Sequence, residues 1–122
     1  MSSDLLVKIE KAIRKIIKSE DPIIANLLLF FKYYKKDMWL YPGILKRKFG
    51  LKIVDAYSLL KSLELEGILA GYYELYCCHC QKSNGIVHTF NELPVTFHCE
   101  LCNEELNTLE NAVLIYKVIK NE

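Results

Sequence analysis

Two Cys-x-x-Cys pairs constrain the fold of this chain more than any other feature. The pairs are Cys77–Cys80 and Cys99–Cys102, and 18 residues lie between them. Each pair closes a tight knuckle, and two knuckles at the ends of β-hairpins bring four thiolates into a tetrahedron. Zinc favours this donor set because its filled d shell imposes no geometry and thiolates are soft donors. We therefore predict a structural Zn²⁺ site made by these four cysteines.

The segment that carries the cysteines has few large apolar residues from which to build a core. Phe90, Phe97 and Leu101 are the main candidates, with a handful of aliphatic residues. A module this small rarely folds on such a core, whereas a structural zinc contributes about 10–16 kcal/mol in small metal domains. Because the protein would supply all four ligands, no position is left for water or substrate, which argues against catalytic zinc.

The same cysteines are compatible with chemistry other than zinc binding. Charged residues such as Lys8, Glu10 and Lys11 interrupt any signal-peptide core near the N-terminus, so we expect a cytoplasmic protein with reduced thiols. That expectation disfavours a disulfide framework. A redox pair would leave the second Cys-x-x-Cys without a role, while an iron centre with the same four ligands stays possible.

The residues inside and beside the knuckles are not expected to bind metal. Cys78 could compete with Cys77, but its one-residue gap to Cys80 does not fit a knuckle. We expect His79 and His98 to be exposed. The residue after each pair needs a left-handed backbone, which Asn103 tolerates and Gln81 adopts less readily, so the first knuckle is predicted to be less regular.

Charge divides the chain into two parts. Residues 1–73 contain 13 Lys and Arg against 8 Asp and Glu, whereas residues 74–122 contain 3 against 7. We predict a helical domain at 1–73 and a zinc ribbon with a terminal strand at 74–122. No apolar run reaches the ~18 residues of a membrane span, so no membrane partner is expected.

The first part is predicted to be helical. The expected helices cover residues 3–20, residues 22–36 after the Asp21-Pro22 start signal, Tyr41-Pro42 to the Gly50 cap, and Ile53–Glu66. The second helix is apolar almost all round, which predicts the central core helix. An apolar stripe on the first helix makes a homodimer possible through Leu6, Ile9, Ile13 and Ile16.

The second part is predicted to be antiparallel β. Residues 68–76 read as a strand leading into Cys77, and residues 112–119 as a β-branched terminal strand. Strands at 86–90 and 95–99 are expected to be joined by a turn at 91–94. The fold class is therefore α+β, with a helical domain followed by a small antiparallel zinc ribbon.

The segment from Leu45 to Leu69 resembles the helix-turn-helix core of winged-helix proteins. In that pattern a short helix ends at a glycine, and a second helix ends in Leu-x-x-x-Gly before aliphatic residues, here Gly50, then Leu63, Gly67, Ile68 and Leu69. The resemblance covers about residues 22–76. A winged helix followed by a Cys₄ ribbon is similar to the layout of archaeal transcription factor E. One departure is that the strand after Gly67 runs directly into Cys77, so the ribbon is expected where a winged helix has its two-stranded wing.

The resemblance implies double-stranded DNA as a partner, because the later helix of such folds enters the major groove. The outward side of 53–66 carries one cation among several apolar groups, whereas base-reading helices use Arg, Lys, Asn or Gln. The basic cluster before this helix can hold phosphates. The candidate nucleic-acid-binding residues are Lys46, Arg47, Lys48, Lys52, Tyr57 and Lys61.

Two function classes follow from these features. The first is a DNA-binding or transcription-associated regulator. The alternative is an adaptor subunit that binds another protein through its apolar helix faces and acidic ribbon. We expect no enzyme, because the sequence contains no glycine-rich phosphate loop and no nucleophile elbow.

Overall fold

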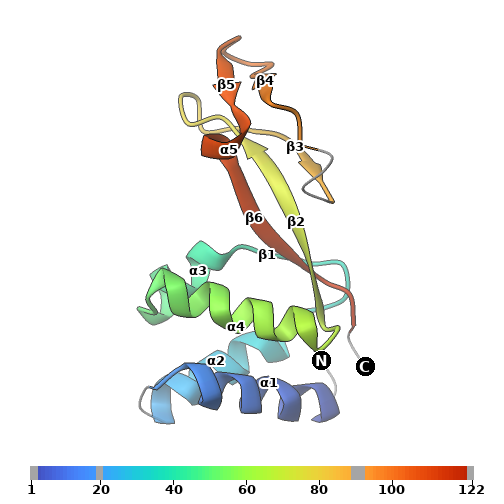
Figure 1. The fold of residues 1–122 in the computed structure, drawn as a ribbon. Helices are drawn as coiled ribbons and strands as arrows, with labels where there is room; N and C mark the ends of the chain where they lie inside the picture. Colours follow the sequence, from blue (N-terminus) through green and yellow to red (C-terminus); the bar gives the residue numbers. More distant parts are fainter. Residues whose placement is uncertain (1–2, 19–20, 89–92, 121–122) are drawn as a thin grey trace. The chain divides into compact units, whose positions relative to one another are not determined.

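The computed structural model describes residues 3–18, 21–88 and 93–120 (Figure 1). It is a mixed α+β protein with a four-stranded antiparallel sheet in the order β1-β6-β2-β3 and a separate β4-β5 pair. Among the helices that it describes, none combines the length and apolar character that a membrane span requires. The predicted α+β fold class is thereby confirmed at this level.

Contacts divide the chain into two compact units. The first comprises Met1–Ala70 and Tyr116–Glu122, and the second comprises Gly71–Ile115. The predicted boundary after residue 73 placed the whole C-terminal stretch with the ribbon. In the structure the chain instead leaves the helical unit, forms the ribbon, and returns to the helical unit through its last strand.

The core of the helical unit is built around α4 (Ile53–Leu65). Four of its side chains, Ala56, Leu59, Leu60 and Leu63, are completely buried. The helix ends in a Schellman motif, in which the Ile68 N–H donates to the Leu63 carbonyl and Gly67 adopts a positive φ of 77°. The predicted helix at 53–66 and its stop at Gly67 are confirmed.

The short helix α3 (Pro42–Phe49) also lies where the sequence placed it. Pro42 opens the helix, where its missing N–H costs nothing. Gly50 closes it in the left-handed conformation, and its N–H donates to the carbonyl of Lys46 at 2.9 Å. The basic residues of its last turn face the negative end of the helix dipole.

Helices α1 (Ser3–Ile16) and α2 (Asp21–Lys32) are both shorter than predicted. The first ends at Ile16 and packs against α2, and the Ile17 N–H still donates to the Ile13 carbonyl at 2.7 Å. The second stops at Lys32 because the Tyr33 and Tyr34 N–H groups bond to carbonyls three residues back, which tightens the last turn.

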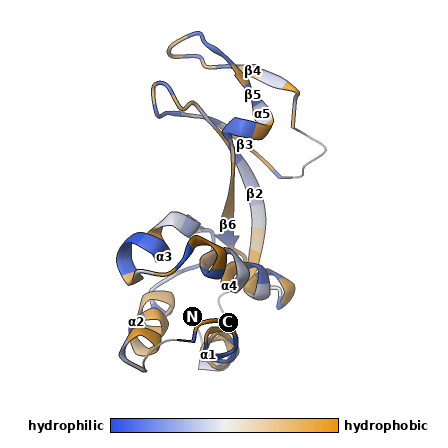
Figure 2. Cartoon of the chain, turned by 60° about the vertical axis from the view of Figure 1, so that its left-hand side comes forward, coloured by the Kyte–Doolittle hydropathy of each residue, from blue (hydrophilic) through white to orange (hydrophobic). Residues whose placement is uncertain are grey.

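The prediction that α2 is the central core helix is wrong. Only one side of it is buried, through Ile24, Leu27 and Phe31. Leu29 remains 50% exposed on the other side although the helix is mainly hydrophobic along its length (Figure 2). An apolar helix normally hides its whole surface, so this outer side of α2 is unusual.

A small strand ties the C-terminal stretch to the helical unit. The strand β1 (Trp39–Leu40) pairs antiparallel with β6 (Ala112–Val118), with Leu40 opposite Tyr116. Leu40 and Tyr116 are both buried. The predicted terminal strand is confirmed, and its end supplies core residues to the helical unit.

In the ribbon each knuckle joins the two strands of one hairpin. The first hairpin pairs β2 (Leu69–Tyr76) with β3 (Ser83–Val87), and the second pairs β4 (Thr96–His98) with β5 (Glu105–Asn107). The expected pairing of strands at 86–90 and 95–99 is wrong. β3 pairs with the strand before the first knuckle, and β4 pairs with the strand after the second knuckle, because a short turn brings consecutive strands together. The turn predicted at 91–94 lies partly outside the described residues. A short helix, α5 (Thr108–Asn111), leads from β5 into β6.

Candidate functional site

The first knuckle follows directly from the end of β2. The Cys77 N–H donates to the Lys82 carbonyl at 2.9 Å, and the Gln81 N–H donates to the Cys77 carbonyl at 2.8 Å. These two bonds curl the backbone so that the Cys80 N–H also points at the Cys77 sulfur, 3.5 Å away. The local backbone therefore positions both sulfurs of the pair on the inner side of the turn.

The second knuckle repeats this arrangement between β4 and β5. The Cys99 N–H donates to the Glu104 carbonyl at 3.0 Å, and the Asn103 N–H donates to the Cys99 carbonyl at 2.8 Å. In both knuckles these two hydrogen bonds join residues at the same sequence positions relative to the first cysteine. The repetition is a property of the Cys-x-x-Cys backbone and does not depend on the residues between the cysteines.

The two knuckles are equally regular, so the prediction of a less regular first knuckle is wrong. Gln81 has φ of 59° and Asn103 has φ of 60°. The turn geometry forces both positions into the left-handed region whatever the side chain. The left-handed conformation is more strained for glutamine than for asparagine, but the hydrogen bonds of the knuckle hold Gln81 in it.

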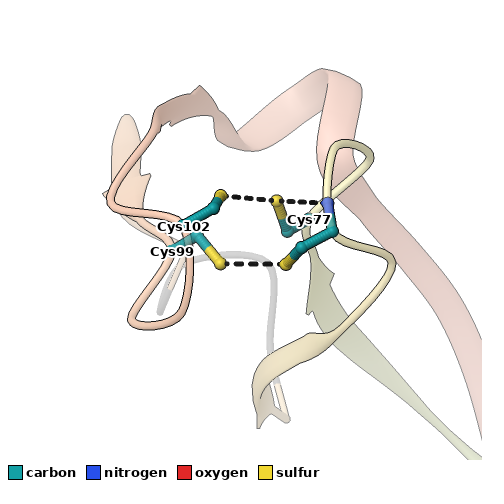
Figure 3. A group of neighbouring side chains, drawn as sticks. Cys77, Cys99 and Cys102 are labelled. Atoms are coloured by element: carbon teal, nitrogen blue, oxygen red, sulfur yellow. Dashed lines mark hydrogen bonds between the residues drawn. The ribbon is translucent and has the colours of Figure 1, made fainter.

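The four sulfurs of the two knuckles face one another (Figure 3). The Cys77 and Cys102 sulfurs lie 3.5 Å apart, the Cys80 and Cys99 sulfurs lie 3.3 Å apart, and all four lie within 4.8 Å of each other. Zn–S bonds of about 2.3 Å in a tetrahedron separate the sulfurs by ~3.8 Å. The cluster thus has the dimensions of a site that can hold a metal ion, and its cysteines are free thiols.

A small hydrophobic cluster supports the sulfurs from one side. Cys77 and Cys99 are completely buried within it. Its other buried members are Leu75, Phe97 and Leu106. Leu101, expected in the core, is 70% exposed because it lies at the tip of its knuckle. Phe90 lies outside the described residues. The cluster is small for an independent fold, so a metal ion held by the four sulfurs would add substantially to its stability.

Asn84 links the two hairpins beside the sulfurs. Its side-chain oxygen accepts a hydrogen bond from the Glu100 N–H at 3.0 Å, and its amide group lies within bonding reach of the Cys99 thiol. Sequence reasoning missed this residue. Outer hydrogen bonds of this kind orient metal ligands, but nothing local in the sequence marks which polar residue will supply one.

Hydrogen bonds make the four thiols unequal when no metal holds them. Backbone N–H groups, first that of Cys102 and then that of Leu101, lower the pKa of the Cys99 thiol to about 6. The hydrogen bond to Cys99 and burial raise the pKa of Cys80 to about 12. Negative charge is therefore favoured on Cys99, whereas Cys80 retains a proton that a divalent cation would displace.

The remaining candidate ligands stay outside the cluster. Cys78, His79 and His98 are exposed, and none of them belongs to the group of four sulfurs. Among the described residues, this group is the only one of three or more His, Cys, Asp or Glu side chains close enough to share an ion.

Four of the predicted nucleic-acid-binding residues lie together on the helical unit. Lys46, Arg47, Lys48 and Lys52 are exposed at the end of α3 and just before α4. Within the described part of the chain, none of the four makes an ion pair with a carboxylate. Lys48 instead places its ammonium 5.2 Å from the centre of the Phe30 ring.

The other two candidates are less suited to DNA. Lys61 forms an ion pair with Glu64 at 2.9 Å on the same helix, so a local carboxylate already balances its charge. Tyr57 is half-buried. Beside them on α4, Val54 is 70% exposed and Leu65 is 78% exposed. The outward face of α4 is therefore an open apolar surface with little charge.

The stripe suggested for a homodimer is partly used inside the protein. Ile9 and Ile13 are completely buried between α1 and its neighbours, while Leu6 and Ile16 are half-buried. Ile9 and Ile13 are thus not available to a second copy of the chain.

Comparison with known proteins gives no relative from which to infer a function. No protein-family model, no curated protein and no solved structure matches the chain significantly.

Proposed function

We propose that this chain is a non-enzymatic zinc-binding module of the winged-helix and zinc-ribbon type that binds double-stranded DNA or acts in transcription. The observation that carries the zinc site is the cluster of four sulfurs within 4.8 Å, a complete tetrahedral ligand set. Thiolate sulfurs at tetrahedral spacing favour zinc over harder metals such as magnesium or calcium.

The order of the strands supports the winged-helix part of the proposal. A winged helix closes with two neighbouring strands after its second helix. Here β2 and β6 follow α4, are neighbours in the sheet, and have the ribbon between them in the sequence. The ribbon then forms the connection between the two wing strands, whereas the sequence suggested that it replaces them.

The exposed cations at the end of α3 support DNA as the ligand. Lys46, Arg47 and Lys52 have no carboxylate partner among the described residues, so phosphate groups can neutralise them without breaking an existing ion pair. Phosphate contacts of this kind fix the position of a protein on DNA without reading its sequence. The apolar face of α4 offers little for reading base edges, so we expect weak sequence preference.

Binding to a duplex as a function of salt tests this function. The zinc-loaded chain should bind a labelled duplex at low salt, and log K should fall linearly with log salt by about 0.9 for each phosphate contact. A flat response, or no binding at low salt, would remove the DNA function.

One observation favours the alternative of a protein adaptor. Val54 and Leu65 expose most of their apolar surface on the same helix face, and such surfaces commonly mark protein interfaces. If DNA binding fails, a co-purifying protein that is lost with Leu65→Asp but kept with Val7→Asp, at an exposed apolar position on α1, would identify this face as the interface.

A further inference from the structure

A second candidate site lies entirely within the helical unit, between the outer side of α2, the segment after it, and α3. It is a pocket of about 530 Å³, within the range of about 300–1,000 Å³ typical of small-molecule sites. It is distinct from the four-cysteine cluster, which lies in the other unit. The proposed phosphate contacts do not involve its interior.

Aromatic side chains form most of its wall. The Phe30 ring lies 4.9 Å from that of Tyr34 and 5.3 Å from that of Phe49, and the ring planes meet at 57° and 75°. Tyr33 also lines the pocket. The rings pack against one another at steep angles without stacking, and the pocket that they line has room for a further planar ring in edge-to-face contact.

The apolar lining of this pocket is open to solvent. Leu29 and Met38 line it and are 50% and 43% exposed. Leu29 lies on the exposed side of α2, and Met38 lies in the segment between α2 and β1. Burying this surface against an apolar ligand is favourable by the hydrophobic effect, with no rearrangement of the core.

The polar groups that line the pocket favour a negatively charged ligand. Among the described residues that line it, Lys48 is the one charged side chain and none is a carboxylate. The Lys48 ammonium lies against the Phe30 ring at the wall, and the Asn26 amide can donate a further hydrogen bond. The Tyr34 hydroxyl is protonated at neutral pH and can donate, and burial raises its pKa further.

We propose that this pocket binds a small amphipathic aromatic anion, with its ring among Phe30, Tyr34 and Phe49 and its carboxylate or sulfonate at Lys48. A cation beside an apolar wall, without a competing anion among the described lining residues, distinguishes such a ligand from a neutral or cationic compound of the same shape. The aromatic wall distinguishes it from inorganic phosphate or sulfate.

Displacement of a fluorescent probe tests the proposal. The zinc-loaded full chain is titrated with anilinonaphthalene sulfonate, and the bound probe is then displaced with naphthoate or with its neutral isostere naphthamide. We expect saturable binding and a preference for naphthoate of about tenfold, the effect of one charge-assisted hydrogen bond. Equal affinities for acid and amide, or probe binding that does not saturate, would overturn the proposal.

Matched variants locate the site. Lys48→Gln should remove the preference for naphthoate and leave naphthamide binding unchanged, whereas Lys46→Gln, on the same helix but outside the pocket lining, should keep the preference. Leu29→Glu should abolish probe binding, whereas Val54→Glu, an exposed apolar position on α4, should not. Equal effects within either pair would refute the assignment. Because no DNA is present, the result is independent of the proposed DNA function.

Discussion

The Asn84 side-chain oxygen accepts a hydrogen bond from the Glu100 N–H at 3.0 Å, and this contact joins the first hairpin to the second knuckle. The two residues belong to different hairpins that share no backbone ladder with each other. Asn84 therefore contributes to the mutual placement of the two cysteine pairs before any metal binds. A site that is arranged in advance loses less entropy when the ion enters.

Replacing Asn84 should weaken metal binding without removing a ligand. We expect Asn84→Ala to lower the zinc affinity by about tenfold or more, because outer hydrogen bonds typically contribute that much. Competition with a chelator of known affinity measures the change. Lys82→Ala is the matched control, since only the backbone carbonyl of Lys82 takes part in the knuckle. Equal affinities for both variants would exclude a role for the asparagine side chain.

Substitution of the cysteines should show that four of them bind the metal and that one does not. Cys99→Ser should lose the bound metal and unfold the ribbon, while Cys78→Ser, which changes an exposed thiol outside the cluster, should keep one zinc per chain. Elemental analysis and circular dichroism of the purified variants check this. Metal loss in both variants would mean that the ligand set is wrong.

Strain at the left-handed positions should be measurable. Gln81→Gly should stabilise the zinc-loaded ribbon by about 0.5–1 kcal/mol, because glycine adopts φ of 59° without the clash that a Cβ causes. Asn103→Gly should stabilise the ribbon by a smaller amount, since asparagine already tolerates this conformation. Thermal unfolding of the two variants provides the comparison, and a destabilised Gln81→Gly would show that the side chain has a role of its own.

Two leucines on α4 should respond very differently to truncation. Leu59 is completely buried, so Leu59→Ala should cost about 2–5 kcal/mol of unfolding free energy. Leu65 is 78% exposed, so Leu65→Ala should change it by less than about 0.5 kcal/mol. Denaturant unfolding measures both. A large loss for Leu65→Ala would indicate that this face is covered in solution.

The salt dependence of DNA binding should identify the phosphate contacts. Replacing both Arg47 and Lys52 by alanine should reduce the slope of log K against log salt by about 2, if each holds one phosphate. Lys61→Ala should leave the slope nearly unchanged, because Glu64 already pairs with that lysine. Fluorescence anisotropy at several salt concentrations measures the slopes. A larger effect from Lys61 would move the DNA interface onto α4.

Local signals in the sequence were enough to place the cysteine cluster and the helices that precede it. Pro42, Gly50 and Gly67 each fix a helix end through their own backbone properties, and the Cys-x-x-Cys spacing determines each knuckle. These features depend on residues a few positions apart, so the sequence specifies them directly.

Features that depend on distant contacts were missed. The strand at Glu105–Asn107 is short and polar, and only its partner strand makes it β. The exposed side of α2 carries the same apolar residues as a buried side, so hydrophobicity alone suggested a core helix. Asn84 acquires its role from Glu100, 16 positions later, which no local pattern encodes.

The return of β6 to the helical unit has a consequence for folding. Tyr116, the largest completely buried side chain in the described part of the chain, reaches its place only after the backbone has passed through the ribbon from Gly71 to Ile115. If the ribbon unfolds when the proposed zinc is removed, that passage becomes a long loop whose closure costs on the order of 3 kcal/mol. On the proposed function, zinc would hold the ribbon as a folded connection between β2 and β6. The metal would then stabilise the last strand of a unit that contains none of its ligands, so removing it should weaken both units together.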